Sequence, residues 1–158
     1  MSRYSKILDF IIEKHEGQVD KGGKPYFLHP ITVALSCQNE SEKVVALLHD
    51  ILEDTDTTPA TLLELGVTEK ELEAIQLLTK PKKEDYLHYV GRVSKNTIAR
   101  HVKMSDLLHN MDLSRLPYIT QKDIERKKKY EKAYAFLEKC DCENKEMNDI
   151  GDIDNDCR

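Results

Sequence analysis

VVALLHDILED, residues 44–54, combines a broad apolar face with one imidazole and three carboxylates. On a helical wheel of about 100° per residue, the Val, Leu and Ile side chains fill one arc. His49, Asp50, Glu53 and Asp54 fall on the remaining side. This pattern predicts a helix that buries its apolar face at the centre of the fold and gathers its polar groups on one side.

The polar side of this helix carries an unbalanced negative charge. Three neighbouring carboxylates repel one another unless a cation lies among them or water screens them. A solvated helix surface is the ordinary explanation, but no Lys or Arg lies between Lys43 and Lys70. The adjacent His49 and Asp50 offer nitrogen and oxygen ligands that can converge on one metal ion. His29, before Pro30, and Asp106, in the apolar segment 98–111, are the candidate partners from elsewhere in the chain.

Helical spacing and sparse Gly and Pro punctuation predict an all-α fold. No run alternates as a strand would, and the apolar content of 39% supports one core. We expect a compact single-domain bundle of about seven or eight helices within residues 1–140. Ser41 is the predicted cap of the third helix, and Thr68 and Glu71 form a predicted capping box on the fifth. The predicted helices cover residues 3–15, 30–38, 41–54, 58–65, 68–78, 86–94, 97–114 and 121–140.

The negative charge of the chain is concentrated at its end. Seven of the 29 acidic and two of the 24 basic residues lie within 141–158, so residues 1–140 hold 22 of each. The folded part therefore lacks the basic surface of a nucleic-acid-binding protein, and no nucleic acid polymer is expected as a partner. Residues 141–158 have few apolar side chains and no period, which predicts a disordered acidic tail.

The rest of the composition indicates a protein of the cytoplasm. No apolar run approaches the length of a membrane span, and the first ten residues lack the pattern of a signal peptide. Cys37 stands alone, and Cys140, Cys142 and Cys157 lie at or beyond the last predicted helix. These four residues form no framework around a small core, so we expect free thiols.

Three blocks of sequence together resemble a known family. They are HEGQVDKGGKPYFLHP at 15–30, VVALLHDILEDTDTT at 44–58 followed by LTK at 78–80, and VKMSDLLHNM at 102–111. In this order they resemble the HD superfamily of metal-dependent phosphohydrolases. More narrowly, the chain is similar to the hydrolase domain of RelA/SpoT-type alarmone enzymes and to their small stand-alone relatives, across roughly residues 1–140.

The resemblance implies a metal site and a nucleotide pocket. It implies a divalent metal, most often Mn²⁺, and the acidic pair Glu53 and Asp54 to position or activate water. Lys21 and Asn110 match residues near the substrate, and Lys24, Lys80 or Arg100 are further candidates to offset its charge. The metal ligands that the resemblance implies are His29, His49, Asp50 and Asp106.

The implied activity is the removal of 3′-pyrophosphate from guanosine tetraphosphate (ppGpp). Two positions depart from the family pattern: Asp20 and Leu107 stand where Arg is common, so positive charge near an anionic substrate is lost. A phosphatase acting on another nucleotide and a non-catalytic nucleotide-binding HD module are the alternatives. A chain of 158 residues leaves no room for a synthetase domain, so pyrophosphokinase activity is not expected.

Overall fold

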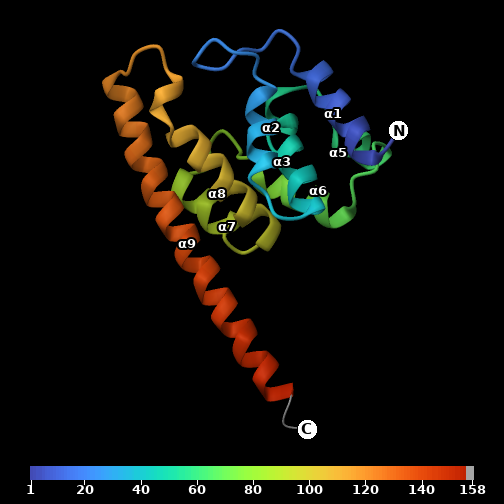
Figure 1. Cartoon of the computed structure of the whole chain (residues 1–158), viewed down its shortest axis with the longest axis vertical. Coiled ribbons are helices and arrows are strands. Elements are labelled where there is room, and N and C mark those ends of the chain that lie inside the picture. Colours follow the sequence, from blue (N-terminus) through green and yellow to red (C-terminus); the bar gives the residue numbers. More distant parts are fainter. Residues whose placement is uncertain (156–158) are drawn as a thin grey trace.

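The computed structural model describes the backbone of residues 1–155 and the side chains of residues 1–148, and this part of the chain is helical without a β-strand (Figure 1). An isolated bridge joins Val19 to Pro25 in the loop after the first helix. The elements are α1 (Arg3–Lys14), α2 (Leu28–Leu35), α3 (Glu40–Leu48), α4 (Ile51–Asp54), α5 (Pro59–Glu64), α6 (Glu69–Leu78), α7 (Tyr86–Val93), α8 (Thr97–Met111), the 3-10 turn Leu113–Arg115 and α9 (Gln121–Asn155).

Three helices form the centre of the fold. α2, α3 and α8 contact one another, α6 packs on α3 and α8, and α9 runs along α8 (Figure 1). The apolar residues of α3 from Val44 to Leu48 are all buried, as the amphipathic pattern predicts. This central position confirms the all-α bundle and places His49, which follows Leu48, in the interior.

Local capping sets most helix ends. Thr68 and Glu71 form the predicted capping box of α6, and Thr58 caps α5 with Pro59 in its first turn. The third helix differs from the prediction, since Asn39 rather than Ser41 accepts from the first-turn amide of Glu42. The Ser41 hydroxyl instead donates to Glu71, a long-range partner that no local pattern contains.

The segment 44–54 is not one continuous helix. α3 ends at Leu48 and α4 begins at Ile51, so His49 and Asp50 lie in an irregular turn between them. The His49 Nδ1–H donates to the Ala46 carbonyl at 2.6 Å, which occupies an acceptor that the helix would otherwise use for its own ladder. Because of this break, the helical wheel of a continuous helix does not describe the directions of the His49 and Asp50 side chains.

The predicted disordered tail is wrong for residues 141–155, because α9 continues to Asn155. The Asp141 carboxylate is buried, accepts from Arg100 Nε at 3.1 Å and lies 2.6 Å from His101 Nε2. Lys145 adds a contact of 2.9 Å one turn later. Burial raises the pKa of Asp141, but these cations outweigh burial and hold that pKa well below its ordinary value. Residues 156–158 lie outside the described part.

The Asp141 contacts join the segment beyond Lys139 to α8 and should contribute to stability. Asp141→Ala leaves the Arg100 guanidinium buried without its counter-charge, so the free energy of unfolding should fall by about 3 kcal/mol. Urea denaturation measures this change. Glu143→Ala is the control, since Glu143 pairs with Lys139 at 3.9 Å on the exposed side of the same helix and should change stability little. Equal effects of the two substitutions would contradict the role of Asp141.

Two further expectations concern the whole chain. Cys37, Cys140 and Cys142 are free thiols, as predicted, whereas Cys157 lies outside the described residues. Across residues 1–155, the structure contains no helix with an apolar stretch of the length needed to span a bilayer.

Candidate metal centre and pocket

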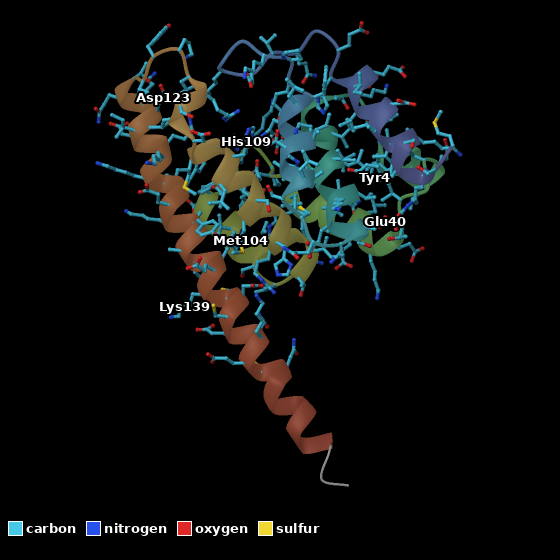
Figure 2. The ribbon with its side chains drawn as sticks, in the orientation of Figure 1. Tyr4, Glu40, Met104, His109, Asp123 and Lys139 are labelled. Carbon is cyan, nitrogen blue, oxygen red and sulfur yellow. The ribbon has the colours of Figure 1, made fainter. Side chains whose placement is uncertain are left out.

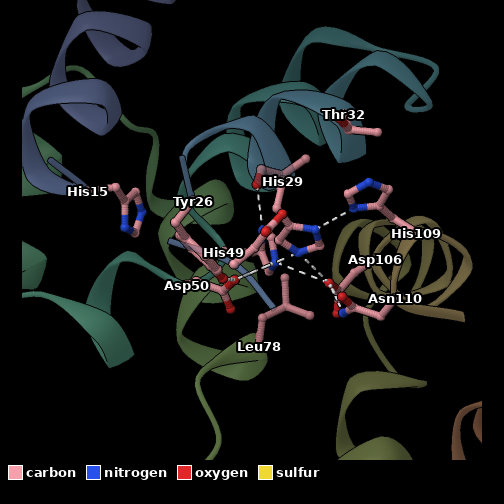
Figure 3. A network of polar contacts seen from close by, with 12 residues as sticks. His15, Tyr26, His29, Thr32, His49, Asp50, Leu78, Asp106, His109 and Asn110 are labelled. Carbon is pink, nitrogen blue, oxygen red and sulfur yellow. Dashed lines mark hydrogen bonds and ion pairs between the residues drawn. The ribbon is translucent and has the colours of Figure 1, made fainter. Parts of the chain in front are cut away.

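The four residues predicted as metal ligands lie together in the interior (Figure 3). His29 comes from the start of α2, His49 and Asp50 from the break between α3 and α4, and Asp106 from α8. Asp106 Oδ1 lies 2.9 Å from His29 Nε2 and 3.4 Å from His49 Nε2, and Asp50 Oδ2 lies 3.0 Å from His49 Nε2. The tertiary structure thus brings two imidazoles and two carboxylates from three segments into one cluster.

A second layer of polar groups fixes these side chains. The Tyr26 hydroxyl donates to Asp50, and Asn110 Nδ2 donates to Asp106 Oδ1 at 3.0 Å. His29 and His109 stack with ring centroids 4.9 Å apart and with their Nδ1 atoms 2.6 Å apart. Since these contacts restrict the rings and carboxylates to one orientation, the cluster is preorganised for binding.

The cluster strongly favours a positive charge at its centre. Burial lowers the pKa of His49, but the carboxylates of Asp50 and Asp106 outweigh burial and raise it well above its ordinary value. Burial likewise opposes ionisation of Asp106, yet Lys103 and His49 hold the pKa of Asp106 well below the usual range. The raised pKa of His49 shows that the surrounding carboxylates stabilise a positive charge, as they would for a metal ion, and the lowered pKa of Asp106 shows that this carboxylate stays ionised.

The donor set fits a divalent metal ion. His29, His49 and Asp50 each offer a ligand atom, and these atoms lie within 4.8 Å of one another. Because the Nδ1–H of His49 donates to the Ala46 carbonyl, its Nε2 is free to act as a ligand, and Nε2 is buried without a hydrogen-bond partner in the described chain. Two imidazole nitrogens with carboxylate oxygens suit manganese, iron, cobalt or zinc.

The acidic pair Glu53 and Asp54 follows the cluster in α4. Glu53 Oε1 accepts from the Lys80 backbone amide at 2.9 Å, so the LTK segment orients this carboxylate. Burial raises the pKa of Asp54, and the charges of Asp50 and Glu53 raise it further. A carboxylate with a raised pKa is a better proton acceptor near neutral pH.

The predicted ligands other than His49 line one pocket of about 380 Å³, together with the acidic pair. The lining also includes Lys21 and Asn110, so the structure brings the predicted substrate residues beside the predicted metal ligands. Other predictions are corrected. Arg100 is buried against Asp141 and Ser94, neither Lys24 nor Lys80 lines the pocket, and Leu107 is fully buried in the core. Position 107 does not face the pocket, so Leu107 in place of Arg removes no positive charge from it.

Sequence reasoning missed several pocket residues, among them Lys103, Tyr26 and Arg115. Lys103 Nζ contacts Asp106 Oδ2 at 2.8 Å, a pairing that the i,i+3 spacing on α8 indicates. Tyr26 contacts Asp50, and Arg115 contacts Asp20. The positions of Tyr26 and Arg115 depend on loop packing that no periodic pattern reveals. Burial, followed by the positive charge of Arg115, lowers the pKa of His109 to about 4, so its imidazole is neutral near pH 7.

Fold and site together define the class of the protein, a helical HD hydrolase fold with a buried His/Asp cluster. The solved structure of a metazoan ortholog of SpoT, described as hydrolysing ppGpp, superposes with a TM-score of 0.73. It is 22% identical and covers 87% of this chain and 85% of its own. At that identity the likeness establishes the fold.

Sequence comparison identifies the relatives more narrowly. The chain is 33% identical over 118 residues to the guanosine-3′,5′-bis(diphosphate) 3′-pyrophosphohydrolase of Aquifex aeolicus, and 34% identical over 131 residues to the protein of that name from Borreliella burgdorferi. It is 30% identical over 123 residues to the GTP pyrophosphokinase rsh of Brucella melitensis. The chain is thus a relative of the RelA/SpoT-type proteins.

The matches cover a limited part of each relative. They extend over 67%, 71% and 68% of this chain but over 17%, 19% and 16% of the three relatives. This chain therefore spans less than a fifth of the length of these proteins. A comparison with family models found no match.

Proposed function

We propose that the chain is a metal-dependent phosphohydrolase that removes the 3′-pyrophosphate of ppGpp, with His29, His49, Asp50 and Asp106 as ligands of Mn²⁺. The observation that carries the proposal is the convergence of these four side chains and the acidic pair on one pocket. The names of the pyrophosphohydrolase relatives support this choice of substrate.

A divalent ion bound by the cluster would lower the pKa of water and polarise the phosphoryl group. Glu53 and Asp54 would orient the attacking water and accept its proton, with Glu53 fixed by the Lys80 amide. The Lys21 ammonium and the Asn110 amide would bind substrate oxygens in the same pocket. Water adds to the 3′-pyrophosphoryl group, the bond to the 3′-oxygen breaks, and GDP and pyrophosphate leave.

A phosphatase acting on a different nucleotide is the second candidate. Asp20 favours it, because this carboxylate lines the pocket at a position where relatives of the resembling family commonly carry Arg. A non-catalytic sensor has less support, since the chain retains the four proposed ligands and both acidic residues within one site.

The test is incubation of the protein with manganese and each of a panel of nucleotides that includes ppGpp, GTP and 3′-phosphorylated nucleosides. We expect ppGpp to be converted to GDP and pyrophosphate in equal amounts, as measured by ion-exchange chromatography. A protein treated with EDTA serves as the control and should lose turnover, which manganese restores. Turnover of another nucleotide with ppGpp left intact would favour the second candidate, and no turnover of any nucleotide would contradict both.

A further inference from the structure

One wall of the pocket is formed where the loop after α1 meets the turn after α8. Asp20 Oδ1 accepts from the backbone amides of Gly22 and Lys24, both at 2.9 Å, which fixes the loop and the carboxylate. A Cβ at Gly22 would lie 2.7 Å from the Arg115 carbonyl oxygen, so the loop packs directly on the backbone of Arg115. Asp20 and Arg115 therefore hold a defined position relative to each other.

The Arg115 guanidinium keeps free donors at this wall. Its Nη1 lies 3.6 Å from Asp20 Oδ2, close enough for an ion pair but beyond a good hydrogen bond. Its Nε is buried and has no hydrogen-bond partner in the described residues. The side chain is 26% exposed and lines the pocket. A planar guanidinium with unused N–H groups matches the oxygens of a phosphate.

Three other cations of the pocket are paired with carboxylates: Lys103 with Asp106, Arg126 with Asp123, and Lys127 with Glu131 at 3.6 Å. The Lys103 ammonium contacts Asp106 at 2.8 Å, within the metal cluster. Arg126 pairs at 3.4 Å with Asp123 of its own helix, and Figure 2 labels Asp123 near the start of that helix. Since Lys21 presents a compact ammonium, Arg115 is the planar cation with a buried, unpaired donor at this wall.

We infer that Arg115 is a specificity-determining residue that binds the 5′-diphosphate of the nucleotide, and that Asp20 positions it. The inference rests on the proposed function, in which the metal cluster and the acidic pair take the reacting 3′-pyrophosphate. The remaining diphosphate then needs a cation elsewhere in the same pocket. From the sequence alone, the Asp20 carboxylate looks unfavourable for binding an anionic substrate. In the structure it instead holds the Arg115 guanidinium, which comes from another segment.

The experiment measures equilibrium binding rather than turnover. Isothermal titration calorimetry on the manganese-loaded protein gives the Kd for GDP, which carries the 5′-diphosphate, and for guanosine, which carries no phosphate. Arg115→Gln should weaken GDP binding about 10- to 100-fold, as expected for the loss of a charged hydrogen bond, and leave guanosine binding unchanged. Arg92→Gln is the matched control, because Arg92 pairs with Glu84 outside the pocket.

Two further variants test the geometry. Arg115→Lys keeps the charge without the planar fork and should recover only part of the GDP affinity. Asp20→Asn retains an oxygen for the loop amides but removes the ion pair, so it should change GDP affinity in the wild type and not in the Arg115→Gln background. Additive effects of the two substitutions would show that Asp20 does not act through Arg115.

The remaining outcomes are distinct. Unchanged GDP affinity in Arg115→Gln, or equal affinity of the wild type for GDP and guanosine, would overturn the inference. An equal loss of guanosine binding would also overturn it and would mean that the guanidinium contacts the base. Failure of the proposed function is a separate result: the wild-type protein would release no pyrophosphate from ppGpp, whatever its affinity for GDP.

Discussion

Asp50→Ala is expected to abolish manganese binding and hydrolysis together while the protein remains folded. The Asp50 carboxylate lies 3.0 Å from His49 Nε2 and supplies one of two anionic oxygens in the cluster. Its side chain is 22% exposed at the pocket, so truncation opens no large cavity in the core. Calorimetric titration with manganese measures binding, and circular dichroism confirms the helical content.

Asp56→Ala is the matched control for this experiment. Asp56 is close in sequence, and its side chain is 89% exposed where it pairs with Lys14. This variant should bind manganese and turn over substrate as the wild type does. Manganese affinity in Asp50→Ala equal to that of the wild type would remove Asp50 from the proposed ligand set.

His49→Ala is a less direct test than the sequence indicates. On the ideal wheel His49 faces away from the apolar side, so its loss should leave the core intact. In the structure its side chain is 4% exposed and its Nδ1–H donates to Ala46. Truncation would therefore leave a cavity and a backbone acceptor unpaired, and a loss of metal would be mixed with a loss of stability.

Glu53→Gln is expected to retain manganese and lower kcat about 10²–10⁴-fold, the usual effect of losing a positioned general base. The glutamine oxygen can still accept from the Lys80 amide, so the side chain keeps its orientation and loses its basicity. Single-turnover kinetics with ppGpp and a manganese titration separate chemistry from metal binding.

Glu64→Gln provides the control, because Glu64 is an exposed residue of α5 outside the pocket. It should leave kcat unchanged. If Glu53→Gln retained full activity, Glu53 would have no part in the chemistry, and Asp54, with its raised pKa, would become the candidate base.

The candidate site is largely predictable from local sequence. His49 and Asp50 adjoin a strongly apolar run, and such a run is buried in any compact fold of this chain. His49 and the adjacent Asp50 are therefore expected to lie near the core, where an uncompensated charge is costly. That argument predicts a cation in this region. The resemblance implied His29 and Asp106 as further ligands, and the structure places Asp106 Oδ1 2.9 Å from His29 Nε2 and 3.4 Å from His49 Nε2.

Where the prediction was wrong, a partner distant in sequence decided the outcome. Composition alone makes residues 141–158 a poor candidate for order, yet Arg100 and His101 of α8 pair with Asp141 and the helix continues. The same holds for the break at His49, which follows from a side-chain bond to Ala46 inside a packed interior. Each is an interaction between specific atoms that neither periodicity nor propensity encodes.

Sequence by itself determined the helical class and the position of His49 and Asp50 beside the core, because burial of apolar faces depends on spacing that can be counted along the chain. Tertiary structure alone decided which charges face the pocket. It placed Leu107 and Arg100 in the interior and brought Arg115 to Asp20 across 95 positions of sequence. A charge acts through its distance to other charges in space, and that distance exists only once the loops and helices have packed.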